Sequence, residues 1–234
     1  MIGSPRIHWR VIDSTNERAK TAAAAGAPHG TLVTTDEQTA GRGRQGRVWT
    51  APPGSSLLMS LLLRGLEERH AMLPLGAAVG VCEACESLTG VECAIKWPND
   101  VWIGGRKVAG ILLEGRPQEG WTVLGIGLNV STRAADFPAE LRDTATSLAA
   151  AAGAPSPGPE VALRAVVPAL ARRLDAPAES VLTAWRERDA LRGSGVRWNG
   201  GHGLAAGVDE SGALLVETDS GRVALDAGEV HLLA

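Results

Sequence analysis

The chain has little of several residue types, and its few cysteines and short apolar runs each exclude a class of protein. Its 234 residues include three cysteines, three lysines, one phenylalanine and no tyrosine. A small, odd number of cysteines argues against a disulfide framework and fits the reducing cytoplasm. No apolar run reaches the roughly 18 residues of a membrane span, and the N-terminal segment lacks the apolar core of a signal peptide. We therefore expect a cytoplasmic protein without a membrane partner.

The overall composition is that of an ordinary globular protein. Apolar residues make up 44% of the chain and charged residues 21%, which excludes a disordered or fibrous protein. The formal net charge of −3 provides no general attraction to nucleic acid. Since only three of the 23 basic residues are lysines, the positions of Lys20, Lys96 and Lys107 call for an explanation.

The apolar pattern predicts alternating strands and helices as far as about residue 191. We expect strands at residues 7–12, 32–35, 57–63, 94–97, 101–103, 108–114 and 121–130. Helices are expected at about 14–25, 72–88, 160–174 and 178–191. Ser14 is expected to cap the first helix, with Glu17 completing a capping box. The Ala-, Gly- and Pro-rich stretch 149–159 is expected to form an exposed loop.

The character of the sequence changes after Gly193. Short strand-like segments alternate with turns there, which predicts a small β-barrel. We place a domain boundary at this point, with one domain at residues 1–192 and a second at 193–234.

Residues 41–47 form a glycine- and arginine-rich loop, GRGRQGR. Its spacing matches G-x-G-x-x-G, but a dinucleotide-binding fingerprint needs a helix to begin there, and the following segment with Pro52-Pro53 cannot start one. Free glycine backbone and three guanidinium groups can instead fold over an anion such as phosphate. A solvated loop and an RNA-binding Arg-Gly segment remain alternatives, so the loop alone favours phosphate only slightly.

A second candidate is the sequence KWPND at 96–100, followed by GGRKVAG at 104–110. The two glycines predict a tight hairpin that returns Lys107 to face Trp102. Two ammonium groups and the carboxylate of Asp100 then share one region of the sheet. Lysine suits phosphate and aspartate suits Mg²⁺, although a structural ion pair at a sheet edge is a serious competing interpretation.

Two further segments offer polar or small residues to a ligand. The Ser-Thr-Asn sequence at 14–16 opens a helix, where hydroxyl and amide groups can bind a polar heterocycle. Gln38 adds another amide near the glycine–arginine loop. Gly125 and Gly127 lie within a strand pattern, which suggests that another group approaches the backbone closely.

Other kinds of site find no support in the sequence. Cys82 and Cys85 lack a second pair, so a buried helix face is favoured over zinc binding. No Ser/His/Asp nucleophile set is visible, and the P-loop pattern G-x-x-x-x-G-K-S/T is absent.

Taken together, these segments resemble those of the biotin protein ligases, also called biotin–acetyl-CoA-carboxylase ligases. They follow the family's order and spacing from about residue 7 to residue 130, and the C-terminal segment looks like the family's SH3-like domain. The resemblance implies an α+β fold, in which a mixed β-sheet backed by helices, shared with lipoate ligases, precedes a small SH3-like β-barrel. It rests on Ser14-Thr15-Asn16, Gln38, Gly41 to Arg47, Trp49, Lys96 to Asp100, Gly105 to Gly110 and Gly125 to Asn129.

The resemblance also implies a reaction in two steps. The carboxylate of biotin attacks the α-phosphate of ATP, which gives biotinyl-5′-AMP and pyrophosphate. A lysine of a biotin carboxyl carrier protein then attacks this anhydride and releases AMP. Neither step needs a protein nucleophile, so the protein has to position reactants and neutralise charge.

The family pattern further implies roles for single residues. Those implied at biotin are Ser14, Thr15, Asn16, Gln38, Arg42, Gly43, Arg44, Lys107 and Gly110. Those implied at the nucleotide are Arg42, Arg44, Arg47, Trp49, Lys96 and Asn129. Lys107 and Arg44 would be catalytic through the biotin carboxylate and the phosphate, and Asp100 would bind Mg²⁺.

Several alternatives stay open at this stage. Some family members carry a DNA-binding domain before the catalytic region, but here the motifs start close to the N-terminus, so we expect a ligase that does not bind DNA. A lipoate-type ligase of the same fold would need a more apolar pocket. A non-catalytic biotin-sensing regulator would not need Lys107. A monomer and a ligand-dependent homodimer both fit the sequence.

Overall fold

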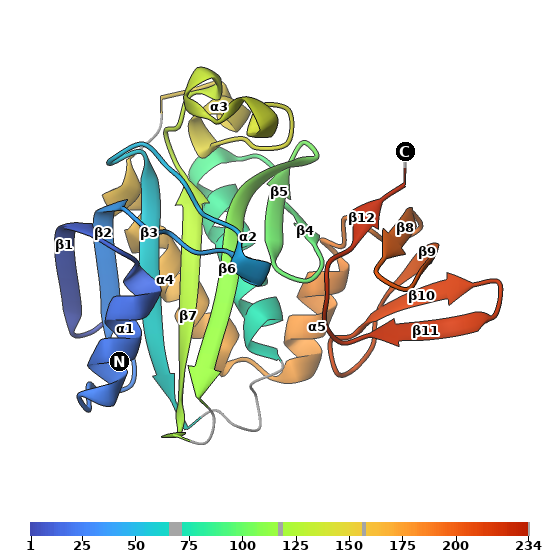
Figure 1. Ribbon diagram of the computed structural model, residues 1–234, viewed down its shortest axis with the longest axis horizontal. Coiled ribbons are helices and arrows are strands. Elements are labelled where there is room, and N and C mark those ends of the chain that lie inside the picture. Colours follow the sequence, from blue (N-terminus) through green and yellow to red (C-terminus); the bar gives the residue numbers. More distant parts are fainter. Residues whose placement is uncertain (66–71, 117–118, 156–157, 234) are drawn as a thin grey trace.

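The computed structural model describes residues 1–65, 72–116, 119–155 and 158–233. Two β-sheets and five α-helices form the described part of the chain (Figure 1). The helices are α1 (Thr15–Ala24), α2 (Leu73–Thr89), α3 (Leu148–Ala152), α4 (Pro159–Asp175) and α5 (Ala178–Arg186). The strands are β1 (Arg6–Ile12), β2 (Leu32–Gln38), β3 (Ser56–Arg64), β4 (Ala94–Lys96), β5 (Asp100–Ile103), β6 (Arg106–Arg116), β7 (Trp121–Asn129), β8 (Gly195–Trp198), β9 (Gly201–Val208), β10 (Leu214–Thr218), β11 (Gly221–Leu225) and β12 (His231–Leu232).

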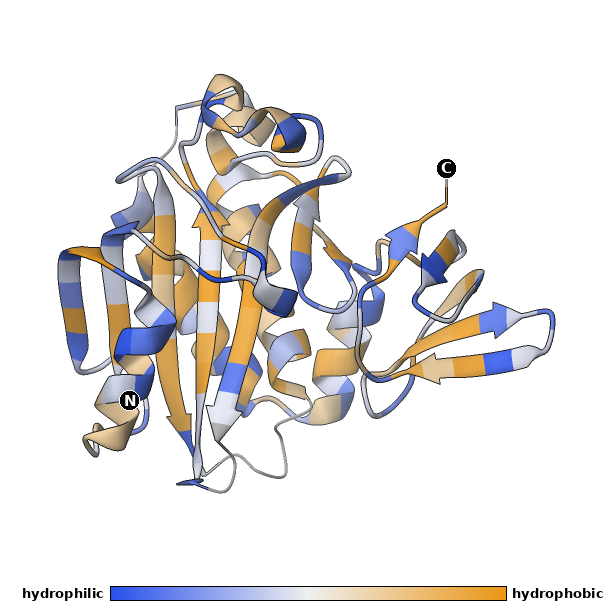
Figure 2. Ribbon diagram, in the orientation of Figure 1, coloured by the Kyte–Doolittle hydropathy of each residue, from blue (hydrophilic) through white to orange (hydrophobic). Residues whose placement is uncertain are grey.

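The first sheet has seven strands in the order β1-β2-β3-β7-β6-β5-β4. β1 and β2 are parallel, whereas all other neighbours are antiparallel, so the predicted mixed sheet is confirmed. The central pair runs in register from Ser56 opposite Asn129 to Arg64 opposite Trp121. Both central strands are buried along almost their whole length. Figure 2 shows β3 as mostly hydrophobic, and β7 as hydrophobic residues alternating with near-neutral ones.

Helices cover both faces of this sheet. In β3, Leu61 and Leu63 belong to the large core formed with α2 and α4, whereas Leu62 belongs to a smaller core with Ala19 and Ala23 of α1. This alternation follows from the period of two along a strand. α1 therefore lies on the opposite face from α2 and α4 (Figure 1). α1 contacts β2, β3 and β7, while the part of that face over β6 lies beside the cavity described below.

The second sheet is the compact antiparallel sheet expected of an SH3-like domain. Its five strands have the order β11-β10-β9-β8-β12. It is anchored to the first domain by the indole N–H of Trp97, which donates to the carbonyl of Gly212 at 3.1 Å. Leu214 and Val216 belong to the same apolar core as the first sheet. The boundary at residue 193 stays a prediction.

Most expected elements are confirmed with small shifts at their ends, but three details differ. The helix expected at 178–191 ends at Arg186, because the backbone of residues 188–190 pairs with Ile95 of β4 instead of continuing the helix. Ser14 occupies the N-cap position without a side-chain capping bond. Glu17 pairs instead with Lys20 and Arg42, so the capping box is wrong. Charge-assisted contacts to two cations replace the bond to one backbone amide. The expected loop at 149–159 is shorter, since α3 occupies its first part and α4 begins at its last residue. Residues 156–157 of that loop lie outside the described part.

Candidate active site

A cavity of about 580 Å³ lies over β6 and β7, beside the start of α1. Its wall comes from the glycine–arginine loop, the segment 137–145 and the C-terminal segment 228–231, in addition to the two strands. Every residue that the sequence analysis assigned to biotin, nucleotide or metal lines this cavity. The fold thus brings the separate motifs into one site, while the role of each residue stays a prediction.

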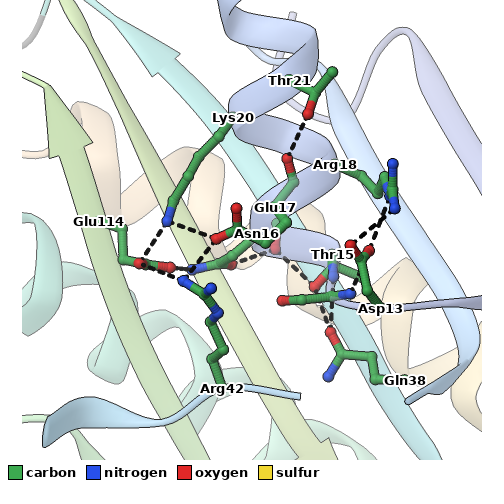
Figure 3. A network of polar contacts seen from close by, with 12 residues as sticks. Asp13, Thr15, Asn16, Glu17, Arg18, Lys20, Thr21, Gln38, Arg42 and Glu114 are labelled. Carbon is green, nitrogen blue, oxygen red and sulfur yellow. Dashed lines mark hydrogen bonds and ion pairs between the residues drawn. The ribbon is translucent and has the colours of Figure 1, made fainter. Parts of the chain in front are cut away.

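One end of the cavity, which we call the amide end, carries hydroxyl and amide groups of 14–16 and Gln38. The backbone N–H and the hydroxyl of Thr15 both donate to Oε1 of Gln38, at 2.8 and 3.1 Å. Ser60 Oγ donates to Asn16 Oδ1 at 2.5 Å. The two bonds from Thr15 orient Gln38 and leave its amide nitrogen without a hydrogen-bond partner among the described residues (Figure 3). The end therefore offers a donor to a polar ligand.

The opposite end, which we call the cationic end, gathers both lysines of the second motif. Nζ of Lys107 lies 2.7 Å from Oδ1 of Asp100. Nζ of Lys96 lies 5.3 Å from the centre of the Trp102 ring. Burial lowers the pKa of Lys96, and the charge of Lys107 lowers it further, although Asp100 opposes the shift. As predicted, Trp102 faces Lys107 across the hairpin.

Two arginines of the loop lie at the cationic end and reach the C-terminal segment. Arg44 donates to Oδ1 of Asn99 at 3.3 Å and to the carbonyl of Gly228 at 3.2 Å. Arg47 forms an ion pair with Glu229. A loop from the first domain and a segment from the second therefore close this end of the cavity together. In agreement with the rejection of a dinucleotide fingerprint, only a single 3₁₀ turn forms in the loop.

Arg42 is directed elsewhere. Its guanidinium lies 2.7 Å from Glu17 and 3.6 Å from Glu114, beside the amide end. Arg42 is therefore separated from Arg44 and Arg47 in this structure. This placement is consistent with a role at biotin, while its predicted contact with the nucleotide stays untested.

The glycines of β6 and β7 are explained by close approach of side chains. A Cβ atom on Gly125 would lie 2.2 Å from Oδ1 of Asn16, and one on Gly127 would lie 2.5 Å from the ring of Trp49. Gly110 opposes Gly127 on the neighbouring strand, and a Cβ atom there would also touch Trp49, at 3.0 Å. The expectation of a close approach at Gly125 and Gly127 is therefore confirmed. Trp49 forms the middle of the cavity wall, between its two ends.

Sequence reasoning missed three residues that shape the site. Ser60 binds Asn16 from β3, Glu114 binds it from β6, and Glu229 holds Arg47 from the second domain. The only local signal was the charge of Glu114 at the end of an otherwise apolar strand. Ser60 and Glu229 carry no motif, because their partners are distant in the sequence.

A resident metal centre finds no support in the part of the chain that the structure describes. No group of three or more His, Cys, Asp or Glu side chains there could hold a metal ion. Cys82 and Cys85 are buried on α2, which confirms the helix-face interpretation, and all three cysteines are free. No helix in the described ranges is long and apolar enough to cross a membrane.

The geometry can now be compared with known proteins. Residues 9–131, more than half of the chain, match the model of the biotin/lipoate A/B protein ligase family. Residues 201–233 match the biotin protein ligase C terminal domain. The chain belongs to the biotin protein ligases. The second match identifies the biotin branch of the family, and it coincides with the second sheet.

Individual relatives agree with this assignment. The chain is 36% identical over 244 residues to the bifunctional ligase/repressor BirA of Bacillus subtilis, which covers 99% of this chain and 75% of that protein. It is 35% identical over 250 residues to the biotin–acetyl-CoA-carboxylase ligase of Mycobacterium tuberculosis, which covers 96% of this chain and 90% of that protein. The biotin protein ligase from Aquifex aeolicus, solved in complex with biotin and ATP, has a TM-score of 0.86 at 31% identity and covers 98% of this chain and 99% of its own. The chain is therefore a biotin protein ligase enzyme.

Proposed function

We propose that this ligase converts biotin and ATP into biotinyl-5′-AMP in the described cavity, and then biotinylates a lysine of a biotin carboxyl carrier protein. The observation that carries this proposal is the two-ended character of one cavity. Hydroxyl and amide groups gather at one end, cationic groups gather at the other, and the wall between them is formed by Trp49. A ureido ring and a triphosphate need these two environments, in this arrangement.

The amide end suits the ureido ring of biotin. This ring has two N–H donors and one carbonyl acceptor, and each loses free energy if it is buried without a partner. Gln38 offers its amide N–H, and Ser14, Thr15 and Asn16 offer buried oxygen atoms. Biotin bound there would extend its valeryl chain along Gly110 toward the cationic end.

The cationic end suits the carboxylate of biotin and the phosphates of ATP. Arg44, Arg47, Lys96 and Lys107 line it, and Asn129 lies at the end of β7 nearby. The indole N–H of Trp49 is buried without a hydrogen-bond partner among the described residues. An adenylate next to this ring would provide both an aromatic stacking partner and acceptor atoms.

The chemistry follows from charge. A carboxylate oxygen of biotin attacks the α-phosphorus, the bond from that phosphorus to the bridging oxygen of the β-phosphate breaks, and pyrophosphate leaves. Two anions approach each other in this step, so Lys107 and Arg44 lower its barrier by offsetting the repulsion where the bond forms. In the second step the carrier lysine amine attacks the acyl carbon, and AMP leaves with the bonding electron pair.

Asp100 fits a limited role toward Mg²⁺. Magnesium in nucleotide enzymes usually keeps several waters and takes one or two carboxylates together with substrate phosphates. Asp100 is a single carboxylate at the cationic end, already paired with Lys107, so it suits an ion that arrives with ATP. Such an ion would neutralise part of the phosphate charge.

The cellular setting follows as a further part of the proposal. Three free cysteines are compatible with the cytoplasm. We infer that the protein acts there as a ligase without DNA binding, either as a monomer or as a ligand-dependent homodimer.

The proposal is tested by measuring pyrophosphate release with purified protein, biotin and ATP, followed by transfer to an apo carrier protein. We expect release that requires both biotin and ATP, and a mass increase of the carrier corresponding to one biotinyl group. Lipoate in place of biotin is the matched control. Activity with lipoate but not biotin, or no release at all, would contradict the proposal.

A further inference from the structure

Four charged side chains form a cluster next to the amide end of the cavity (Figure 3). Nζ of Lys20 lies 2.6 Å from Oε1 of Glu114 and 2.9 Å from Oε1 of Glu17. Arg42 pairs with the same two carboxylates. Two anions and two cations therefore balance, and they join α1, β6 and the glycine–arginine loop.

Glu114 connects this cluster to the cavity through Asn16. The side-chain amide of Asn16 donates to Oε2 of Glu114 at 2.7 Å, while its oxygen accepts from Ser60. An amide held at its nitrogen and at its oxygen has a single orientation. Asn16 lines the cavity and Glu114 does not, so any effect of Glu114 on a ligand passes through its partners.

The charge of Glu114 is maintained by its surroundings. Burial would raise the pKa of this carboxyl, but hydrogen bonds from Lys20 and Asn16 and the charges of Lys20 and Arg42 outweigh it, so the pKa lies below its ordinary value. Lys20, one of three lysines in the sequence, is a direct partner of this carboxylate. As an ionised carboxylate, Glu114 offers both of its oxygens as acceptors, Oε2 to Asn16 and Oε1 to Lys20.

We propose that Glu114 is a positioning residue for biotin, which holds the Asn16 amide in its binding orientation and ties Arg42 of the loop to the same end of the cavity. The proposal rests on the function proposed above. It assigns the cluster of Glu17, Lys20, Arg42 and Glu114 to biotin binding rather than to stability alone.

The test is Glu114→Gln. Glutamine has the same shape, but it offers one acceptor oxygen where Asn16, Lys20 and Arg42 all present donors. We expect the KM for biotin and the calorimetric Kd of biotin to rise about tenfold, the scale of one charge-assisted bond. The KM for ATP should change less than twofold. An unchanged biotin Kd in a folded variant would overturn the proposal.

Glu83→Gln is the matched control. Glu83 has a similar side-chain exposure of 20%, against 24% for Glu114, and it pairs with Arg173 and Arg172 from its position on α2, away from the cavity. Loss of a half-buried ion pair could weaken biotin binding simply by destabilising the fold. In that case Glu114→Gln and Glu83→Gln would raise the biotin Kd equally once their changes in Tm are matched. That outcome would also overturn the proposal.

A second pair of variants separates positioning from a general effect. In an Asn16→Ala background, the link from Glu114 to the cavity through Arg42 remains, at 3.6 Å. If Glu114 acts mainly through Asn16, the change Glu114→Gln should raise the biotin Kd less than twofold in that background. A full additional tenfold loss there would contradict the mechanism. Wild-type protein that fails to bind biotin would instead contradict the proposed function, so the two failures are distinguishable.

Discussion

Nζ of Lys107 lies 2.7 Å from a carboxylate oxygen of Asp100 at the cationic end of the cavity. The same ammonium group lies 5.6 Å from the centre of the Trp49 ring. Asp100 therefore holds Lys107 next to the part of the wall that separates the two ends. An incoming carboxylate or phosphate would compete with Asp100 for this charge, at the point where biotin and ATP have to meet.

Lys107→Ala should impair the first half-reaction most. The ammonium charge offsets repulsion that grows as the carboxylate approaches phosphorus, so its loss should slow adenylation by about 100-fold or more. Lys107→Arg should restore activity only in part, because a planar fork does not replace a compact charge. Biotin-dependent ATP–pyrophosphate exchange measures the step, and thermal unfolding should stay normal. Exchange near the wild-type rate in Lys107→Ala would remove this residue from the mechanism.

Arg44→Gly should weaken retention of biotinyl-5′-AMP more than its formation. Among the described residues, Arg44 donates hydrogen bonds to Asn99 and to the carbonyl of Gly228 and forms no ion pair, so its guanidinium charge is available to a phosphate. Loss of one charge-assisted contact should speed release of the adenylate by about 10- to 100-fold. The measurement is the off-rate of the intermediate and the labelling of lysines on bystander proteins. An unchanged off-rate would refute the assignment.

The two glycines of β7 should respond differently to alanine. Gly125→Ala would push a methyl group against Asn16 at the amide end, whereas Gly127→Ala would push one against Trp49. We expect the first change to raise mainly the KM for biotin and the second to raise mainly the KM for ATP. Each variant is the control for the other, since both substitute the same residue type on one strand. Equal effects on both substrates would contradict the separation of the two ends.

Glu229→Gln should loosen the glycine–arginine loop. Glu229 pairs with Arg47, and ordering a glycine-rich loop costs roughly 1–2 kcal/mol per residue. Trypsin should therefore cut at residues 42–47 faster in the ligand-free variant than in wild type, and biotin with ATP should slow cleavage in both. Glu217→Gln is the control, because Glu217 pairs with Arg222 within the second sheet. Identical cleavage rates with and without ligands would show that the adenylate does not order the loop.

Asp189 should make stability depend on pH. Burial raises the pKa of its carboxyl above 3.8, although backbone bonds from Leu191 and Arg192 oppose the shift, and its Oδ2 is buried without a hydrogen-bond partner among the described residues. The folded state thus binds this proton more tightly than the unfolded chain does. The contribution of Asp189 to the free energy of unfolding is therefore fully present below the pKa of the unfolded chain. It declines as pH rises through the pKa of the folded state. Asp189→Asn should remove that decline.

Chemical denaturation at several pH values between about 2.5 and 7.5 measures the effect, because this range spans the lowered, ordinary and raised carboxyl pKa values. As pH rises, the free energy of unfolding should fall in wild type but not in Asp189→Asn, so the difference between the two should shift in favour of the variant. Asp209 provides a control of opposite sign. Burial would raise its pKa, but hydrogen bonds from Ser211 and from backbone amides outweigh burial and lower it. Asp209→Asn should therefore lose stability relative to wild type as pH rises through the range below about 4, and change little above it. A parallel response of both variants would contradict the two assignments.

The sequence by itself determined the elements and the motifs, because both depend on information within a few residues. Period and turn residues predicted the strands of both sheets, including those after Gly193, with only small shifts at their ends. The loop at 41–47, the lysines of the second motif and the alternating glycines carry recognisable chemistry at short spacing. Those local patterns, together with the resemblance to the biotin protein ligases that assigned Trp49 and Asn129, selected residues that all line the cavity.

Only the tertiary structure decided which of these residues meet, because the strand order places distant segments side by side. Asn16 and Glu114 are 98 positions apart, and Arg44 lies 184 positions from the carbonyl it contacts in the second domain. No local spacing encodes such pairs. The same cause explains the failed capping box: Glu17 is well placed for a cap by sequence, but the fold brings Arg42 to it, and charge-assisted pairing prevails.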